Sequence, residues 1–340
     1  MARLPTRPIV TAIGAGTGAL LVAAGIVGVL VARNDEPAAR GDLIAYSCKE
    51  PKNDWYAICM MKGDGTEKQR LTSRLTTTDP AWSPDGRRIA FTRNEGVGES
   101  TTFTDDDVFV MDADGDDLTQ LTPETDGQMS GQPAWSPDGE NIAFMRGMSV
   151  HSAVPSRFGD LYVMRTDGSE VRRVTTGPAT APTWSPDGRE IAFTRGDNLS
   201  SFSRANMDIY AVDSAGGVPR RLTRTAHIFE TTPAWSPDGL QVAFARWRSQ
   251  TQFDGKEAIY VMARDGSRER LVLRHQHFAG GPESLAWSAD GRTIAFETSP
   301  TPECVAIHLV DVASARVRPL TSCTKKRDSA LAPSWQPASR

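Results

Sequence analysis

Short apolar runs separated by polar turn residues recur along this chain, and each repeat contains four of them. In residues 80–122 the runs are PAWS, RIAFTR, DVFVMD and LTQLT. Their content of valine, isoleucine, threonine and aromatic residues is typical of β-strands. The PDG letters after the first run predict a tight turn, because proline suits its first corner and glycine its positive φ. Each repeat is therefore expected to form four short antiparallel strands.

The repeat returns at a nearly constant interval. The motif Trp-Ser-Pro-Asp-Gly, or a degraded copy, places tryptophans 48 to 53 residues apart at Trp82, Trp135, Trp184, Trp235, Trp287 and Trp335. Four strands in a repeat of about 40–50 residues are typical of a β-propeller blade. We interpret these tryptophans as structural residues of the blades, together with the turn aspartates Asp85, Asp138, Asp187, Asp238 and Asp290.

The two ends of the repeat array complement each other. The array begins with LIAYSC (43–48), a second strand that lacks a first, and it ends with PSWQP (333–337), a first strand that lacks a second. Pairing of these segments would close the ring and remove open sheet edges. We therefore predict an all-β fold, a six-bladed propeller whose last blade is shared by both ends of the chain.

The N-terminal segment differs from the repeats. Residues 9–32 contain no charged side chain, and about 20 apolar residues in a helix can span a bilayer. This predicts a cytoplasmic tail (1–8), a transmembrane signal-anchor helix (9–32), a linker (33–42) and an extracytoplasmic propeller (43–340), hence a single-pass protein of the cell membrane. The alternative is secretion after cleavage of a signal peptide.

Bulk charge argues against a nucleic-acid partner. The 340 residues carry a net charge of −4, with a pI near 5.8, and lack a strong basic field. An envelope protein or glycan is the expected partner of a propeller that is itself monomeric.

The repeat resembles the TolB-type propeller repeat, in which a Trp-Ser-Pro-Asp-Gly turn replaces the WD dipeptide; the resemblance covers residues 43–337. The family includes protein-binding propellers, propellers attached to serine peptidases, and metal-dependent lyases of pectin oligosaccharides. The resemblance therefore implies the propeller fold and either protein binding or action on acidic oligosaccharides. TolB carries an α/β domain before its propeller where this chain has residues 9–32, so a role like that of TolB itself does not follow.

Function is expected on the face that carries the long second-to-third loops, because these loops differ in every blade. Four second strands end there in arginine: Arg93, Arg146, Arg195 and Arg246. One interpretation is an arginine crown that binds an anionic ligand at the mouth of the channel. The alternative, which repetition in every blade favours, is that each arginine pairs with an acidic residue of its own blade.

Histidines offer a second candidate site on that face. His151, His227, His275 and His277 fall in its loops, with Glu230 nearby. His227, His275 and His277 are the alternative metal ligands, since imidazole and carboxylate groups bind zinc and related metals. The spacing is a weak signal, so no metal and no other cofactor is predicted.

Four cysteines allow three pairings. Cys48 and Cys59 fall on neighbouring strands of the shared blade, and Cys304 and Cys323 flank the last complete hairpin. We predict the disulfides Cys48–Cys59 and Cys304–Cys323, which an exported domain permits. Four free thiols are the alternative if the membrane topology is reversed.

No catalytic motif appears in the chain. A serine peptidase of this type needs a Gly-x-Ser-x-Gly elbow, which is absent from the sequence, and no carboxylate pair suggests a glycosidase. The sequence thus predicts a non-enzymatic scaffold that binds a protein or a glycan through its variable loops. The alternative is a metal-dependent enzyme that acts on acidic oligosaccharides.

Overall fold

The chain consists of two compact units in the computed structural model, Met1–Ala39 and Arg40–Arg340. The residues that the structure describes are 19–23, 26–30, 42–49, 55–73, 76–94, 106–123, 128–148, 159–196, 206–226, 228–248, 257–275, 284–301, 304–323 and 329–337. All regular secondary structure in these ranges is β-strand, which confirms the predicted all-β class.

The described part of the first unit is a pair of strands. β1 (Ala19–Ala23) and β2 (Ile26–Leu30) pair antiparallel, with Ala19 opposite Leu30. The predicted helix over 9–32 is therefore not confirmed, since the described residues of this segment are strands. Both strands contain β-branched side chains, which lose rotamer freedom in a helix, and Gly28 lowers helix propensity further. The described residues include no helix long and apolar enough to cross a membrane; the rest of 9–32 lies outside them.

Three strand groups of the second unit are separate four-stranded antiparallel sheets. The first contains β6 (Thr77–Trp82), β7 (Arg88–Asn94), β8 (Asp106–Asp112) and β9 (Thr119–Gln120). The second contains β21 (Leu285–Trp287), β22 (Thr293–Thr301), β23 (Cys304–Asp311) and β24 (Val317–Pro319). The third has the order β25-β3-β4-β5, with β25 (Ala330–Trp335), β3 (Leu43–Lys49), β4 (Tyr56–Lys62) and β5 (Gln69–Arg70).

The strands β10 to β20 form one 11-stranded sheet. They are β10 (Gln128–Trp135), β11 (Asn141–Met148), β12 (Gly159–Arg165), β13 (Arg172–Trp184), β14 (Glu190–Gly196), β15 (Met207–Asp213), β16 (Arg220–Arg221), β17 (Ile228–Trp235), β18 (Gln241–Arg248), β19 (Glu257–Ala263) and β20 (Arg270–His275). The long strand β13 pairs with β12 near its start and with β14 near its end. β15 meets β17 at one parallel pair, Met207 opposite Phe229.

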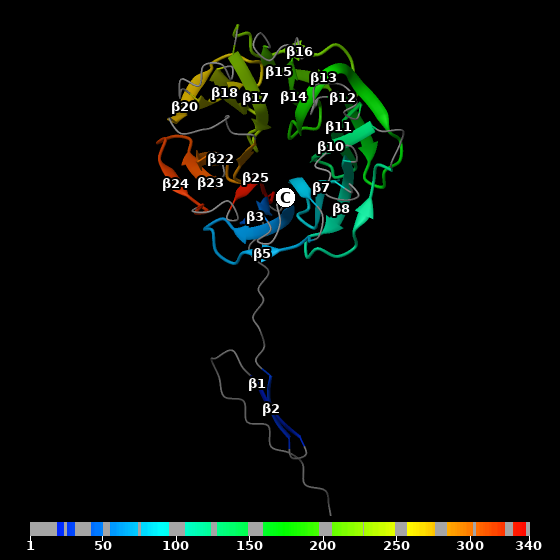
Figure 1. The fold of residues 1–340 in the computed structure, drawn as a ribbon, viewed down its shortest axis with the longest axis vertical. Coiled ribbons are helices and arrows are strands. Elements are labelled where there is room, and N and C mark those ends of the chain that lie inside the picture. Colours follow the sequence, from blue (N-terminus) through cyan, green and yellow to red (C-terminus); the bar gives the residue numbers. More distant parts are fainter. Residues whose placement is uncertain are drawn as a thin grey trace, which may run out of the picture. The chain divides into compact units, whose positions relative to one another are not determined.

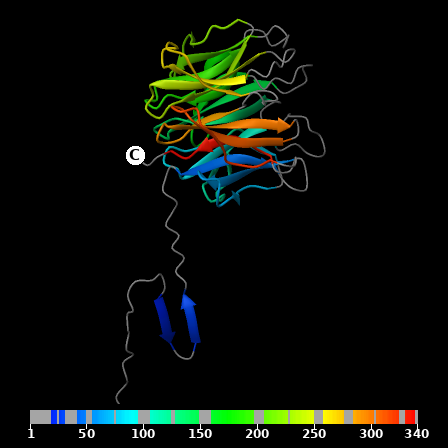
Figure 2. The same ribbon diagram turned by 90° about the vertical axis from the view of Figure 1, so that its left-hand side faces the viewer.

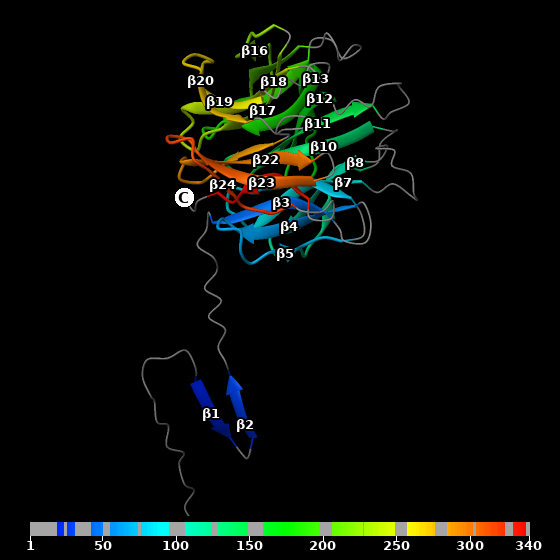
Figure 3. The same ribbon diagram turned by 60° about the vertical axis from the view of Figure 1, so that its left-hand side comes forward.

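The strand groups are arranged around a ring (Figure 1), and the side views show strands running between its two faces (Figures 2 and 3). We call one the turn face; it carries the Ser-Pro-Asp-Gly turns and the third-to-fourth turns of each group. We call the other the loop face; there β7, β11, β14 and β18 end and the next strands begin. Antiparallel order places all turns of one kind on the same face.

The ends of the propeller array pair as predicted. β25 lies antiparallel to β3, with Ala330 opposite Cys48 and Trp335 opposite Ile44. The Gln336 side chain continues the junction, since its Nε2 donates to the Gly86 carbonyl at 3.2 Å. The inner strand of this sheet therefore comes from the far end of the chain, which confirms the predicted closure.

The apolar core lies between neighbouring strand groups. Phe91, Phe144 and Phe193, at equivalent positions of second strands, are fully buried. Three repeat tryptophans bond one group to the next: the indole N–H of Trp135 donates to the Ala81 carbonyl at 3.1 Å, that of Trp184 to Ala134 at 3.0 Å, and that of Trp287 to Ala234 at 3.0 Å. Because stacked repeats share one core, each of these tryptophans stabilises two groups.

The repeat motif builds the same turn five times. In one of them, Ser288 Oγ donates to Asp290 Oδ1 at 2.6 Å, and Asp290 accepts from the backbone N–H of Arg292 at 3.0 Å. Gly291 follows with a φ of 69°, which glycine adopts without steric cost. The turns at Ser83, Ser136, Ser185 and Ser236 have the same bonds.

Both predicted disulfides are present. Cys48–Cys59 joins β3 to β4, and Cys304–Cys323 joins β23 to the segment after β24, each with a Cα–Cα distance of 5.8 Å. They stabilise the two sheets next to the closure.

Candidate functional site

The four arginines at the loop-face ends of the second strands share one environment. Each guanidinium lies over an aromatic ring of the third strand, two residue pairs further along the ladder. The distances to the ring centroids are 4.8 Å for Arg93 and Phe109, 5.5 Å for Arg146 and Tyr162, 5.6 Å for Arg195 and Tyr210, and 4.3 Å for Arg246 and Tyr260. Distances below about 6 Å permit cation–π attraction. Each arginine thus packs within its own strand group.

The same diagonal position is filled by other bonds in the two remaining groups. Cys48 and Cys59 occupy it as a disulfide, because Tyr46 lies opposite Cys59 as Phe91 lies opposite Phe109. Near the end of the chain, Thr298 Oγ1 and His308 Nδ1 are 3.1 Å apart, and burial lowers the pKa of His308. The position is therefore a cross-strand link whose chemistry varies between groups.

Arg246 also forms an ion-pair cluster. Its Nε donates to Glu230 Oε1 at 2.7 Å, and its Nη1 donates to Glu269 Oε1 at 2.6 Å. Glu230 is fully buried. Burial disfavours the charged form of Arg246, but the hydrogen bonds and charges of Glu269 and Glu230 prevail and raise its pKa. The predicted pairing with acidic residues of the same blade thus describes Arg246.

A pocket opens on the loop face beside Arg146. It has a volume of about 430 Å³ and is lined by Gln128, Arg146, Gly147, Gly159, Asp160, Tyr162, Arg173, Gly177 and Pro178. These residues come from β10, β11, β12 and β13, so one strand group builds the whole pocket. A Cβ on Gly159 would lie 2.4 Å from the Arg146 backbone, so only glycine permits this close approach of β12 to β11.

The carboxylate in this pocket has several hydrogen-bond partners, whereas the guanidinium of Arg146 has few. Asp160 accepts from Arg173 Nη1 at 3.2 Å and from the Gly177 backbone N–H at 2.8 Å. Arg146 donates from Nε to Ser130 Oγ at 3.1 Å. Within the described ranges, the terminal nitrogens of Arg146 make no hydrogen bond or ion pair. The pocket therefore offers one open guanidinium edge, that of Arg146, which the hydrogen bond to Ser130 and the ring of Tyr162 hold in place.

The inner strands bend at one repeated position, directly before the proline of the motif. The residues there, Asp79, Gln132, Ala181, Thr232 and Ala332, have φ values between 52° and 55°, and the strand register shifts at each. Such β-bulges free the N–H for other bonds. The N–H of Gln132 donates to Thr92 Oγ1 at 2.9 Å, and that of Ala181 to Gln132 Oε1 at 2.8 Å. The bulges therefore bond neighbouring strand groups together.

The predicted histidine site cannot be assembled from the described residues. His151, His227 and His277 lie outside them, and His275 ends β20 without a described side chain. Within the described ranges, no group of three or more histidine, cysteine, aspartate or glutamate side chains is placed to hold a metal ion. The Glu230 carboxylate forms an ion pair with Arg246.

The repeats of this propeller match a known protein family. The TolB β-propeller domain matches residues 38–198 and 102–340 of the chain. The chain belongs to the TolB β-propeller family. TolB from Acinetobacter baumannii superposes with a TM-score of 0.67 at 21% identity, covering 87% of this chain and 67% of that one. This likeness concerns the fold.

Two curated proteins are similar over part of their length. The TolB homolog of Chlorobium chlorochromatii (strain CaD3) is 29% identical over 187 residues, which is 54% of this chain and 38% of that protein. The uncharacterized peptidase YuxL of Bacillus subtilis (strain 168) is 32% identical over 112 residues, 32% of this chain and 15% of YuxL. The matches thus span less than half the length of either relative.

Sequence reasoning missed the pocket beside Arg146. The four arginines look alike in sequence, and only the glycines around Arg146 set it apart. Gly159 begins its third strand where close backbone approach is needed, and Gly177 has a φ of 103°. Glycines in the middle of strand-forming residues were the available signal.

Proposed function

We propose that this TolB-family propeller is a non-enzymatic binding scaffold, which holds a carboxylate-bearing group of an envelope protein or glycan on its loop face. The observation that carries the proposal is the guanidinium edge of Arg146, open in the pocket while its stem is held by Ser130 and Tyr162. Arginine binds carboxylates through two parallel hydrogen bonds, and a side chain already held in place loses little entropy on binding.

We also infer that the ring has six blades. In support, there are three separate four-stranded sheets, and the 11-stranded sheet divides into three further sets of four strands: β10–β13, β13–β16 and β17–β20. The long strand β13 belongs to two of these sets, because it pairs with β12 near its start and with β14 near its end. Closure through β25 and β3 leaves no strand group incomplete.

The alternative of a metal-dependent enzyme for acidic oligosaccharides depends on His227, His275 and His277. The described residues do not include the side chains of these histidines, so this alternative stays a prediction and no geometry here favours it.

The test uses two polyanions as probes, poly-L-glutamate and polygalacturonate, with poly-L-lysine as the opposite charge. The full chain is titrated with each, and Arg146→Gln is compared with Arg189→Gln. Arg189 is an exposed arginine at a turn on the other face, so it controls for a general loss of positive charge. We expect Arg146→Gln to weaken binding of at least one polyanion about tenfold, because it removes a charge-assisted hydrogen-bonding partner.

Equal binding by both variants and the unaltered chain would contradict the proposal. Release of unsaturated uronates from polygalacturonate, detected by ultraviolet absorbance, would contradict its non-enzymatic part.

We further propose that the propeller lies outside the cytoplasm, tethered at the membrane through the uncharged residues 9–32. The two disulfides support an oxidising compartment, since such bonds are rare in the reducing cytosol. Protease added to spheroplasts, in which the cytoplasmic membrane is the barrier left, should digest the propeller; full protection, with digestion only after lysis, would overturn this localisation.

A further inference from the structure

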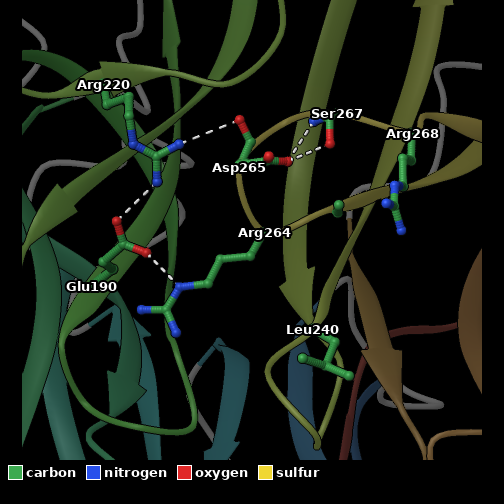
Figure 4. A pocket seen from close by; sticks show the side chains of 8 residues that line it. Glu190, Arg220, Leu240, Arg264, Asp265, Ser267 and Arg268 are labelled. Atoms are coloured by element: carbon green, nitrogen blue, oxygen red, sulfur yellow. Dashed lines mark hydrogen bonds and ion pairs between the residues drawn. The ribbon is translucent and has the colours of Figure 1, made fainter.

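A second pocket lies on the turn face, whereas the pocket beside Arg146 lies on the loop face. Its volume is about 520 Å³, and its lining residues are Glu190, Arg220, Leu240, Ala263, Arg264, Asp265, Ser267 and Arg268. They come from two neighbouring strand groups, β13–β16 and β17–β20. Figure 4 shows Glu190, Arg220 and Arg264 on one side of this pocket, with Leu240 and Arg268 on the other.

One wall of the pocket is a satisfied ion-pair network. Glu190 accepts from Arg220 Nη2 at 2.9 Å and from Arg264 Nε at 2.9 Å, one bond to each carboxylate oxygen. Arg264 also donates from Nη1 to Asp187 Oδ2 at 2.6 Å, and this bond holds the pKa of Asp187 well below its usual range. These charges bind each other and fix the two strand groups, so they have little capacity left for a ligand.

The other wall departs from the repeat at Leu240. In every group, the residue after the first turn bonds its carbonyl to the backbone N–H that follows the third strand. Five groups carry opposite charges on the first residue of this bond and on the last residue of the third strand: Asp42 and Lys62, Arg87 and Asp112, Glu140 and Arg165, Arg189 and Asp213, and Arg292 and Asp311. The sixth carries Leu240 and Ala263, and Leu240 is 66% exposed.

Arg268 adds an unpaired charge to the same pocket. It stands five residues after the third strand, in a left-handed turn position with a φ of 53° that Glu67, Asp117 and Glu170 hold in three other groups; Val218 and Arg316 stand there in the remaining two. The two glutamates pair with a lysine or arginine of their own turn. Among the described residues, the Arg268 side chain makes no hydrogen bond or ion pair. It is thus a basic side chain that the turn does not pair.

A structural role should recur in every repeat, because each blade faces the same packing problem. A departure from the repeat, the exposed Leu240, together with the open guanidinium of Arg268 in the same pocket, therefore indicates a role special to this site. We propose that the turn-face pocket binds an extended peptide segment of a partner protein in which an apolar side chain stands beside a carboxylate. The apolar side chain packs on Leu240 and Ala263, and the carboxylate pairs with Arg268. Charge complementarity selects an acidic partner.

This binding site is independent of the loop-face proposal. The two pockets share no residue, so a variant in one leaves the other intact.

The probe is a short, fluorescein-labelled peptide of alternating leucine and aspartate, titrated into the full chain and followed by fluorescence anisotropy. Its analogues replace every aspartate by lysine or every leucine by serine. The test variants are Leu240→Glu and Arg268→Glu, which install residues that sister blades carry at the same turn positions and should fold normally. The control is Ala315→Glu, which adds a carboxylate at a left-handed position in the corresponding turn of the next blade, outside the pocket, where φ is 58°.

We expect the leucine–aspartate peptide to bind the unaltered chain, and both analogues to bind at least about tenfold more weakly. Leu240→Glu and Arg268→Glu should each weaken binding about tenfold or more, since each sets a carboxylate against the acidic peptide. Ala315→Glu should bind as the unaltered chain does. The proposal is overturned if the unaltered chain fails to bind the peptide, if the lysine analogue binds equally well, or if Ala315→Glu weakens binding as much as Arg268→Glu.

Discussion

At the scale of single residues, the motif Ser-Pro-Asp-Gly acts through one hydroxyl and one carboxylate. Ser288 and Asp290 bond to each other and to two backbone N–H groups, so a turn of few residues satisfies its own polar groups. The hydrogen bond from Ser288 holds the pKa of Asp290 below its usual range, although burial acts in the opposite direction. The ionised form is therefore the one that the fold favours.

This leads to a pH-dependent prediction for Asp290→Asn. A carboxyl group whose pKa is lower in the folded than in the unfolded chain stabilises the fold above the unfolded value, and this contribution disappears as the pH falls through the folded pKa. We expect the substitution to lower Tm at neutral pH by roughly 2–4 °C, and the difference to shrink below about pH 4. Differential scanning calorimetry across this range measures it. The exposed Asp116→Asn is the control, and a Tm difference that stays constant down to pH 2 would contradict the assignment.

At the scale of strands, one diagonal position between second and third strands decides how each blade is linked at its loop-face end. Among the described pairs of second and third strands, four have an arginine over an aromatic ring, another has a disulfide, and another has a threonine–histidine pair. The side chains differ greatly in chemistry, but all bridge the same two strands. The equivalence suggests that these links can be exchanged.

We expect the pair Cys48→Arg and Cys59→Tyr to replace the disulfide in part. Removal of the disulfide by Cys48→Ser and Cys59→Ser should lower the free energy of unfolding by about 2–4 kcal/mol. The arginine–tyrosine pair should recover about 0.5–1 kcal/mol of this loss through cation–π packing. Urea denaturation without reductant compares the two double variants. If the arginine–tyrosine variant is no more stable than the serine variant, the two links are not equivalent.

At the scale of the whole molecule, the ring depends on a strand from the far end of the chain. β25 covers the inner edge of β3, and Gln336 bonds to the turn of the next blade. Without this strand, β3 would expose an unpaired edge rich in apolar residues, and such edges promote association between chains. Closure thus protects the molecule as well as completing it.

Deletion of residues 329–340 should therefore produce larger oligomers or aggregates than the full chain forms, because it removes β25. Deletion of 338–340 alone is the control, since it leaves β25 intact. Size-exclusion chromatography with light scattering measures the mass of both. A monomeric, cooperatively folding protein after the larger deletion would show that closure is not required.

The two faces of the ring follow different rules. The turn face repeats one motif, so the departure at Leu240 stands out against the other strand groups. The loop face varies from blade to blade, so its pocket beside Arg146 is recognised from contacts rather than from a broken pattern. A chain that uses both pockets would connect two partners across one rigid ring.

The sequence by itself determined the strands, the Ser-Pro-Asp-Gly turns, the closure and both disulfide pairs. These features depend on local residue preferences and on the repeat, and both are written in the order of the residues. The tertiary structure decided the rest. Residues 19–23 and 26–30 are strands rather than parts of a helix, because β-branched residues and glycine weaken a helix that apolar content alone suggests. The arginines pack on aromatic rings, and Arg146 and Arg268 face pockets, because a side chain's partners depend on where neighbouring strands and blades place their own side chains.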